Sequence, residues 1–251
     1  MTEHFFIIGA QRSGTTYLYH LLDEHPDICM ARPLRPEPKF FLKNELYACG
    51  LGYYETCYFP DCGQAPLRGE KSASYMESTL AAERLATHYP EAKIIILLRD
   101  PIERAISNYW FSRNHGLETW PIEKAFWEES SRETPYDPSV SVNPFHYLRR
   151  GRYMNFIDVY DRLFPPEQIC GLIYEQLLGN LSQVQALYRF LGAAATFAPR
   201  QLHQASNASQ QEEYALSPDL RRFLADYFAE ANGRLTARFG FDLASWWPSC
   251  Q

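Results

Sequence analysis

Residues 6–18 read FIIGAQRSGTTYL, and this stretch decides the fold. The short apolar run at residues 4–8 predicts a buried strand, and residues 17–22 predict the helix that follows it. Between them, Gly9 and Gly14 let the backbone turn sharply and direct its amide groups at an anion near the helix N-terminus. Strand, glycine loop and helix therefore come in the order of a phosphate-binding loop.

This loop lacks the lysine of a Walker A motif. Thr15 follows Gly14 directly, at the position from which that lysine would reach the β- and γ-phosphates, and Arg12 is the only cation in the loop. The substitution argues against an ordinary ATPase or GTPase. A strand-to-helix turn that uses glycine for geometry alone remains the alternative interpretation of this motif.

Composition limits the class of protein. A chain of 251 residues with 46% hydrophobic content suits one globular domain, residues 1–251, with large loop regions. Its net charge of −6 disfavours a nucleic-acid partner. The first strand starts too close to Met1 for a signal peptide, and no segment offers the ~18 uninterrupted apolar residues of a membrane span. We therefore expect a cytoplasmic protein, whose oligomeric state the sequence leaves unknown.

Apolar runs that alternate with helical patterns predict an α/β fold, a P-loop-type three-layer arrangement with a central, mainly parallel sheet flanked by helices. The clearest later strand is KIIILL at residues 93–98, which is continuously apolar, as expected of a strand covered on both faces. Near the C-terminus, residues 217–238 carry apolar side chains at helical spacing and predict a helix packed against a core.

A second anion site is predicted after residues 93–98. Asp100 is a good N-cap and Pro101 suits the first helical position, so a helix should run to about residue 114. Arg99 then lies at the carboxyl end of a central strand, where open α/β sheets bind ligands, and Ser107 shares a helix face with the cap. Two anion sites suggest a ligand phosphorylated at both ends. The alternative is that Arg99 pairs with Asp100 or Glu103 and that Ser107 faces solvent.

These segments together resemble the sulfotransferases that use 3′-phosphoadenosine 5′-phosphosulfate (PAPS). Residues 6–18 are similar to the family's 5′-phosphosulfate loop, and residues 98–109 (LRDPIERAISNY) to its 3′-phosphate motif. EPKFF at residues 37–41 resembles a segment of the heparan and related carbohydrate sulfotransferases whose glutamate is the catalytic base. GEKSASY at residues 69–75 resembles their Glu-Lys-Ser/Thr-x-x-Tyr segment, whose lysine lies near cofactor and acceptor.

The resemblance implies PAPS as donor, 3′,5′-adenosine bisphosphate (PAP) as product and no metal. It implies a catalytic base, two cations at the transferring group and a histidine near the acceptor, which are Glu37, Arg12, Lys71 and His115. A histidine at a helix end is, however, often a cap or a surface residue. The cofactor-binding residues implied are Gln11, Arg12, Ser13, Gly14, Thr15, Thr16, Arg99 and Ser107.

The chain departs from the family's pattern at two places and matches it at three later segments. Many members have lysine where Arg12 stands, and arginine would stabilise charge rather than donate a proton. The C-terminal part of the chain has no clear match to the loop that covers the adenosine in many members of the family. The polar residues 203–209 either cover the nucleotide or form a linker. Residues 151–153, 164–165 and 173–177 match later landmarks of the family and are interpreted as scaffold.

The resemblance to the carbohydrate branch implies an acceptor hydroxyl or amine on a saccharide or glycosylated small molecule, with a lipid or a peptide tyrosine as the alternative acceptors. Residues 32–63 and 118–150 are expected to shape its site, with aromatic side chains that either stack on the acceptor or pack these segments onto the domain. These aromatic residues are Tyr53, Tyr54, Tyr58, Trp120, Tyr136, Phe145 and Tyr147. A P-loop kinase-like phosphotransferase and a non-catalytic nucleotide-binding protein remain the rival interpretations.

Three of the six cysteines, Cys49, Cys57 and Cys62, fall in one loop-like stretch. Their spacing matches no zinc pattern, and no histidine joins them. We expect free thiols or loop packing, with a local disulfide and a metal site as the alternatives.

Overall fold

The computed structural model describes residues 2–133, 142–204 and 216–246. The chain divides into two compact units. The first comprises residues 1–99 and 158–207, and the second comprises residues 100–157 and 208–251.

The first unit contains a five-stranded sheet in which every pairing is parallel. Its strands are β1 (Glu3–Gly9), β2 (Ile28–Met30), β3 (Leu67–Lys71), β4 (Lys93–Leu98) and β5 (Ile169–Ile173). Their order is β2-β3-β1-β4-β5, so β1 is central and the chain crosses from one side of it to the other between β3 and β4. Such a switch point opens a crevice at the carboxyl ends of the strands, where α/β proteins hold their ligands. The predicted fold class is confirmed.

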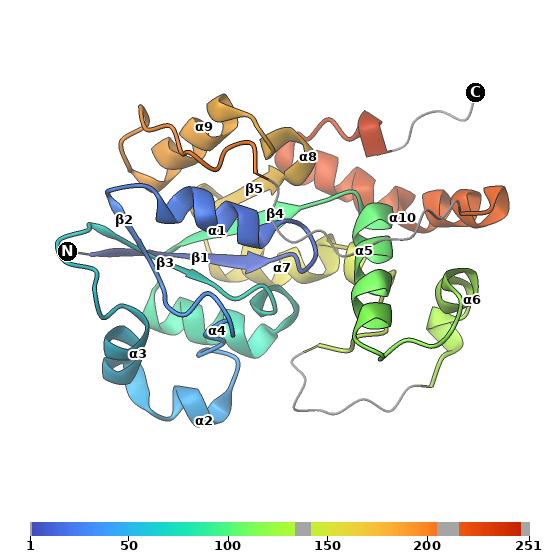
Figure 1. Cartoon of the computed structure of the whole chain (residues 1–251), viewed down its shortest axis with the longest axis horizontal. Coiled ribbons are helices and arrows are strands. Elements are labelled where there is room, and N and C mark those ends of the chain that lie inside the picture. The colour runs from blue at the N-terminus through green and yellow to red at the C-terminus, as the bar shows by residue number, and fades with distance from the viewer. Residues whose placement is uncertain (1, 134–141, 205–215, 247–251) are drawn as a thin grey trace. The chain divides into compact units, whose positions relative to one another are not determined.

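Helices cover both faces of this sheet (Figure 1). On one face α1 (Thr15–Asp23) and α9 (Leu181–Leu191) pack against β1 and β4 through a continuous apolar cluster that includes Phe5, Ile7 and Leu97. On the other lie α4 (Thr79–His88) and α7 (Met154–Leu163), whose residues from Asp158 onward belong to this unit. The remaining helical elements of the unit are α2 (Asn44–Tyr47), α3 (Gly50–Tyr58), η1 (Tyr75–Glu77), η4 (Pro166–Gln168) and α8 (Tyr174–Leu177).

The described part of the second unit is helical. It contains α5 (Pro101–Asn114), α6 (Ile122–Trp127), α10 (Pro218–Phe239) and the short elements η2 (Glu129–Ser131), η3 (Arg149–Gly151) and η5 (Ala244–Trp246). The predicted cap at Asp100 forms, because its carboxylate accepts from Ile102 N at 2.8 Å. At the start of α10 the Ser217 hydroxyl accepts from Leu220 N at 3.3 Å, a cap that the sequence analysis did not identify. Leu220, Leu224 and Phe228 of α10 are buried in the unit's own core, which confirms the interpretation of this helix as core packing.

No helix within the described ranges combines the length and the apolarity that a bilayer crossing requires.

The expectation of free thiols is wrong for Cys62, which forms a disulfide with Cys29 on β2. The chain leaving β2 runs beside the end of α3, where Arg32 N donates to the Tyr58 carbonyl at 2.8 Å, and this brings the two cysteines to a Cα separation of 5.4 Å. Because its sulfur is bonded to that of Cys29, Cys62 cannot be a metal ligand. Cys49, Cys57 and Cys170 are free. Disulfides persist mainly in oxidising compartments. The cytoplasmic location stays a prediction.

Candidate functional site

Four parallel strands of the first unit end at the same edge of the sheet, and each is followed by a residue of the site. The glycine loop follows β1, Lys71 closes β3, Arg99 follows β4 and Tyr174 follows β5. Parallel strands bring these ends together although the residues are up to 160 positions apart. The site therefore depends on the topology of one unit.

The glycine loop has the geometry that its sequence predicts. Gly14 is the N-cap of α1 at φ 86°, a conformation that favours glycine, and a Cβ placed there would overlap the ring of Tyr174. The hydroxyl of Ser13 is fully buried and has no hydrogen-bond partner among the described residues. A buried hydroxyl without a partner at a helix N-terminus is well placed to bind a ligand oxygen.

The structure brings Glu37, Lys71 and Thr16 together from three separate segments. Lys71 Nζ donates to Glu37 Oε1 at 2.7 Å and lies 3.5 Å from Thr16 Oγ1 on the first turn of α1. The second carboxylate oxygen of Glu37 accepts from Ala73 N at 3.1 Å. The Lys71 side chain is only 3% exposed and that of Glu37 is 19% exposed, so both are held inside the site. A base and a cation thus adjoin the anion-binding loop.

Beneath this pair lies a buried carboxyl group, that of Glu70, to which sequence reasoning gave no role. Glu70 accepts from the hydroxyls of Ser72 at 2.6 Å and Tyr54 at 2.8 Å, and also from Tyr75. Burial raises the pKa of Glu70 to about 7, although its three hydroxyl donors favour the charged form and Glu37 nearby disfavours it. Only its place inside the Glu-Lys-Ser segment marked it in the sequence.

The raised pKa of Glu70 makes stability depend on pH. Its folded pKa of about 7 exceeds the ordinary value of 4.5, so the folded protein binds the proton more tightly. The stability that Glu70 contributes is complete below about pH 4.5 and is lost as pH rises to about 7, by about 3 kcal/mol in total. We expect urea unfolding from pH 4.5 to 8 to show this loss in the wild type and not in Glu70→Gln. Parallel pH profiles for the two proteins would contradict the assignment.

The side chain of Tyr174 lies next to two predicted cofactor-binding residues of the first unit, Gly14 and Arg99. Its ring occupies the space in front of Gly14, and the Arg99 guanidinium carbon lies 5.8 Å from the ring centroid. Arg99 Nε is also 4.0 Å from Glu175 Oε1. Sequence reasoning interpreted residues 173–177 as scaffold. The position of Tyr174 directly after an apolar strand is the signal that could have indicated its place at the site edge.

Two predicted site residues belong to the second unit, on or beside α5. Ser107 is buried, with 4% exposure. His115 is exposed as the C-cap residue of α5, where its Nδ1–H donates to the Phe111 carbonyl at 2.8 Å and its ring packs on that of Phe111. These contacts are those of a helix cap. The roles given to Ser107 and His115 stay predictions.

The segments expected to shape the acceptor site are partly described. Tyr54, Tyr58 and Tyr147 are buried and pack these segments, whereas Tyr53 is 42% exposed. Tyr136 and most of residues 203–209 lie outside the described residues.

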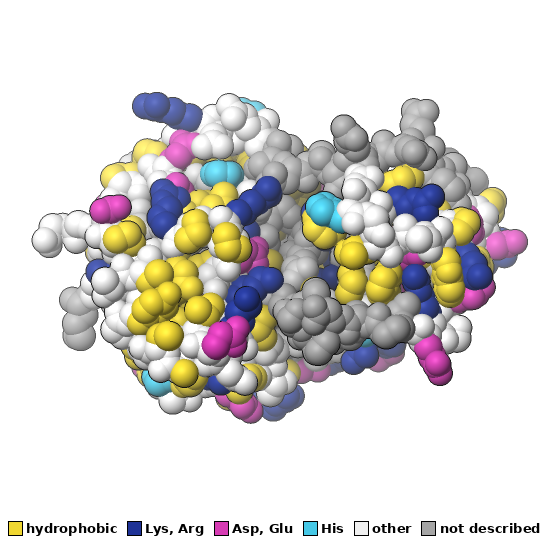
Figure 2. Space-filling view, turned by 60° about the horizontal axis from the view of Figure 1, so that its bottom comes forward, with side chains coloured by type: hydrophobic (Ala, Val, Ile, Leu, Met, Phe, Trp, Pro, Cys, Tyr) yellow, Lys and Arg dark blue, Asp and Glu magenta, His cyan; other side chains and the backbone are white. Residues whose placement is uncertain are grey.

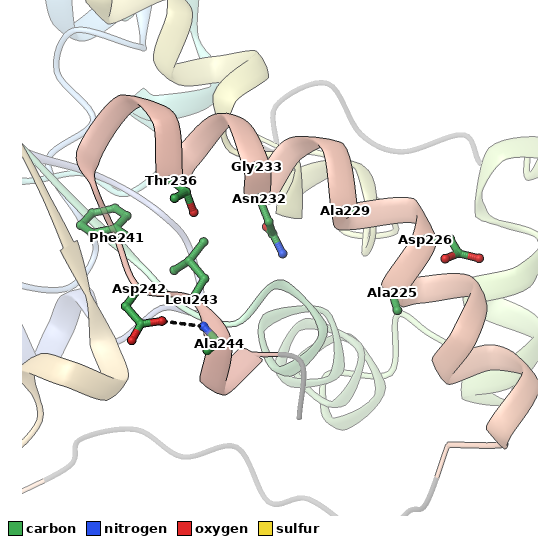
Figure 3. A pocket seen from close by; sticks show the side chains of 10 residues that line it. All are labelled: Ala225, Asp226, Ala229, Asn232, Gly233, Thr236, Phe241, Asp242, Leu243 and Ala244. Atoms are coloured by element: carbon green, nitrogen blue, oxygen red, sulfur yellow. Dashed lines mark hydrogen bonds between the residues drawn. The ribbon is translucent and has the colours of Figure 1, made fainter. Parts of the chain in front are cut away.

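A cavity of about 610 Å³ lies in the second unit along one side of α10 (Figure 3). Small residues of the helix and the segment around Leu243 line it, and its charged lining residues are Asp226 and Asp242. Two carboxylates and no lysine or arginine make it unsuited to a phosphorylated ligand. On the face drawn in Figure 2, basic side chains occur in small groups among hydrophobic and acidic ones. The loop of the first unit remains the candidate anion site.

Comparison with known proteins identifies the family. Residues 2–219 match the model of the sulfotransferase domain. The chain is 30% identical over 269 residues to bifunctional heparan sulfate N-deacetylase/N-sulfotransferase 3 of Homo sapiens, covering 96% of this chain and 31% of that protein. It is also 30% identical over 189 residues to human heparan sulfate glucosamine 3-O-sulfotransferase 6, covering 74% and 51%. The chain thus spans about a third to a half of the length of these relatives.

A solved structure is similar over nearly the whole chain. The crystal structure of a sulfotransferase from Alicyclobacillus acidocaldarius superposes with a TM-score of 0.78 and 27% identity, covering 98% of this chain and 99% of that one. A sulfotransferase domain from the curacin biosynthetic pathway, at 17% identity and a TM-score of 0.50, shares the fold. Because the family model matches residues 2–219, which is most of the sequence, the chain belongs to the sulfotransferase domain family.

Proposed function

We propose that this protein transfers the sulfuryl group of PAPS to a hydroxyl or amine of a saccharide acceptor. One observation carries the proposal: Glu37 pairs with the buried Lys71, whose Nζ lies 3.5 Å from Thr16 Oγ1 of the anion-binding loop. A base, a cation and an oxyanion site in contact are what transfer to a nucleophile requires, because positioning and charge stabilisation dominate such reactions.

The residues of the first unit fit a phosphosulfate group. The unpartnered hydroxyl of Ser13, the glycine at position 14 and the N-terminus of α1 offer donors to anionic oxygens. Arg12 and Lys71 would hold the charge of the leaving phosphate, and Arg99 would hold the 3′-phosphate. When bound, PAPS supplies the sulfuryl group and leaves as PAP.

Glu37 is the group that takes the acceptor's proton in this proposal. Its Oε1 is held by Lys71 and its Oε2 by Ala73 N, so the carboxylate is fixed by one charged and one backbone donor. As the new bond to sulfur forms, the proton of the acceptor O–H or N–H passes to this carboxylate. Lys71 then faces both the base and the loop, and stabilises negative charge on either side.

The saccharide class of acceptor rests on the relatives. Those named above are a bifunctional heparan sulfate N-deacetylase/N-sulfotransferase and a heparan sulfate glucosamine 3-O-sulfotransferase, so both an amine and a hydroxyl are candidate nucleophiles. The Glu37 segment, which resembles the carbohydrate branch, supports the same class.

Thermal unfolding with PAP, with ATP plus magnesium, and without ligand tests the proposal. PAP at ~100 times its Kd should stabilise the protein by about 2.7 kcal/mol and raise Tm by roughly 5–10 °C. ATP with magnesium should give a much smaller shift because the loop lacks the Walker lysine. A shift with ATP and magnesium alone would favour the kinase-like alternative. A shift with PAP but no transfer from ³⁵S-labelled PAPS to any saccharide would favour the non-catalytic nucleotide-binding protein.

A further inference from the structure

Glu70 occupies a position in the sheet that normally carries an apolar side chain. It lies in β3 opposite Phe6 of the central strand β1, and it is 1% exposed. A buried carboxyl group weakens a fold unless hydrogen bonds compensate for its lost hydration. A buried carboxyl group next to the end of β3 therefore calls for an explanation beyond packing.

The hydrogen bonds of Glu70 lead to the backbone of the segment that carries Glu37. The Ser72 hydroxyl donates to Glu70 Oε1, and the Ser72 oxygen accepts from Lys39 N at 2.9 Å. Tyr75 likewise donates to Glu70 and accepts from Phe41 N at 3.0 Å. Each hydroxyl has a single hydrogen. Because Glu70 accepts it, the hydroxyl oxygen stays oriented to receive a backbone N–H.

The segment at Glu37 needs such anchors. Lys39 has a φ of 51°, a left-handed conformation that costs a non-glycine residue energy and persists only where its surroundings hold it. Its amide is the one bound to Ser72. On the other side, the Glu37 carboxylate is held by Lys71 and Ala73, which flank Ser72 in the chain. One buried carboxyl thus organises both the backbone after Glu37 and the turn that binds its side chain.

We propose that Glu70 is a positioning residue that holds the Glu37 carboxylate in place through the hydroxyls of Ser72 and Tyr75. It touches neither donor nor acceptor and acts only through Glu37. Its effect on turnover rests on the proposed function, whereas its effect on residues 37–41 does not.

The test is Glu70→Gln, which keeps the shape but replaces one accepting oxygen by an N–H donor. One hydroxyl must then reverse or lose its partner, and the backbone amide bound to it is released. Hydrogen exchange at Lys39 or Phe41 should accelerate about 5- to 30-fold relative to the wild type. The turnover number for transfer from ³⁵S-PAPS to de-N-sulfated heparan sulfate should fall about 100-fold, with KM for PAPS and Kd for PAP nearly unchanged.

Glu55→Gln is the matched control. Glu55 is also a part-buried carboxylate, but its partners are His4 at 2.9 Å, Tyr89 at 2.8 Å and Arg68. His4 and Arg68 are paired near the amino ends of β1 and β3, opposite the site edge. Its loss should lower stability and leave exchange at Lys39 and Phe41, and the turnover number, close to wild type. Equal losses of turnover in both variants would show a structural role for Glu70 and overturn the proposal.

A double-mutant cycle with Glu37→Gln completes the test. If Glu70 acts through Glu37, Glu70→Gln should change turnover little in the Glu37→Gln background. Additive losses would contradict this.

If Glu70→Gln does not fold, Ser72→Ala removes the anchor of Lys39 alone and should show the same exchange and turnover effects. A wild type without PAP binding or transfer would overturn the proposed function; unchanged exchange at residues 39 and 41 in Glu70→Gln would overturn the positioning role.

Discussion

Replacement of Glu37 by glutamine is expected to lower the turnover number about 10²–10⁴-fold, which is the contribution typical of a general base. Glutamine keeps the shape and can still accept from Lys71, but it cannot take a proton from the acceptor. PAP binding should persist, because the loop and Arg99 are unchanged. The measurement is transfer of ³⁵S from PAPS to de-N-sulfated heparan sulfate, with PAP affinity determined by calorimetry.

Glu45→Gln provides the control for this variant. Glu45 is an exposed glutamate in the first turn of α2, so its substitution makes the same change of charge eight residues away. Its turnover should stay near wild type. A Glu37→Gln protein that retained full turnover would remove Glu37 from the role of base, and one that lost PAP binding would move its role to ligand binding.

Removal of the Cys29–Cys62 disulfide is expected to lower the free energy of unfolding by about 3–4 kcal/mol, because the bond closes a loop with a sequence separation of 33. That loop contains Glu37 and α3, so the unfolded chain gains much freedom when it opens. The variant is Cys29→Ser/Cys62→Ser, and the measurement is the urea midpoint under non-reducing conditions.

Two controls separate the bond from the side chains. Cys49→Ser changes an exposed free thiol and should stay within about 0.5 kcal/mol of the wild type. A reducing agent should destabilise the wild type and leave the double variant unaffected. A wild type whose stability did not respond to reduction would show that the bond contributes little to the folded state.

Local signals explain which elements the sequence predicted well. β4 is a continuous apolar run, and α5 starts at an aspartate cap followed by proline, so each is specified by neighbours in the chain. The glycine loop is equally local, because Gly14 needs its positive φ whatever surrounds it. Glu37 and Lys71 were identified through motif resemblance, and the structure then placed them in contact.

The features that the sequence did not predict depend on the fold. Cys29 meets Cys62 only because an edge strand runs beside the end of a helix, and no spacing rule encodes that approach. Glu70 acquires its partners from α3, a turn and η1, which no local pattern connects.

The contact between Gly14 and Tyr174 has a consequence for how this sequence can evolve. The ring fills the volume that any side chain at position 14 would need, and it also lies beneath Arg99. A larger residue at position 14 is therefore tolerated only if position 174 shrinks, and that exchange would withdraw the surface on which Arg99 rests. Glycine at position 14 is therefore constrained twice, by its own positive φ and by a ring 160 residues away in the chain, so a smaller residue at position 174 would remove only one of the two constraints.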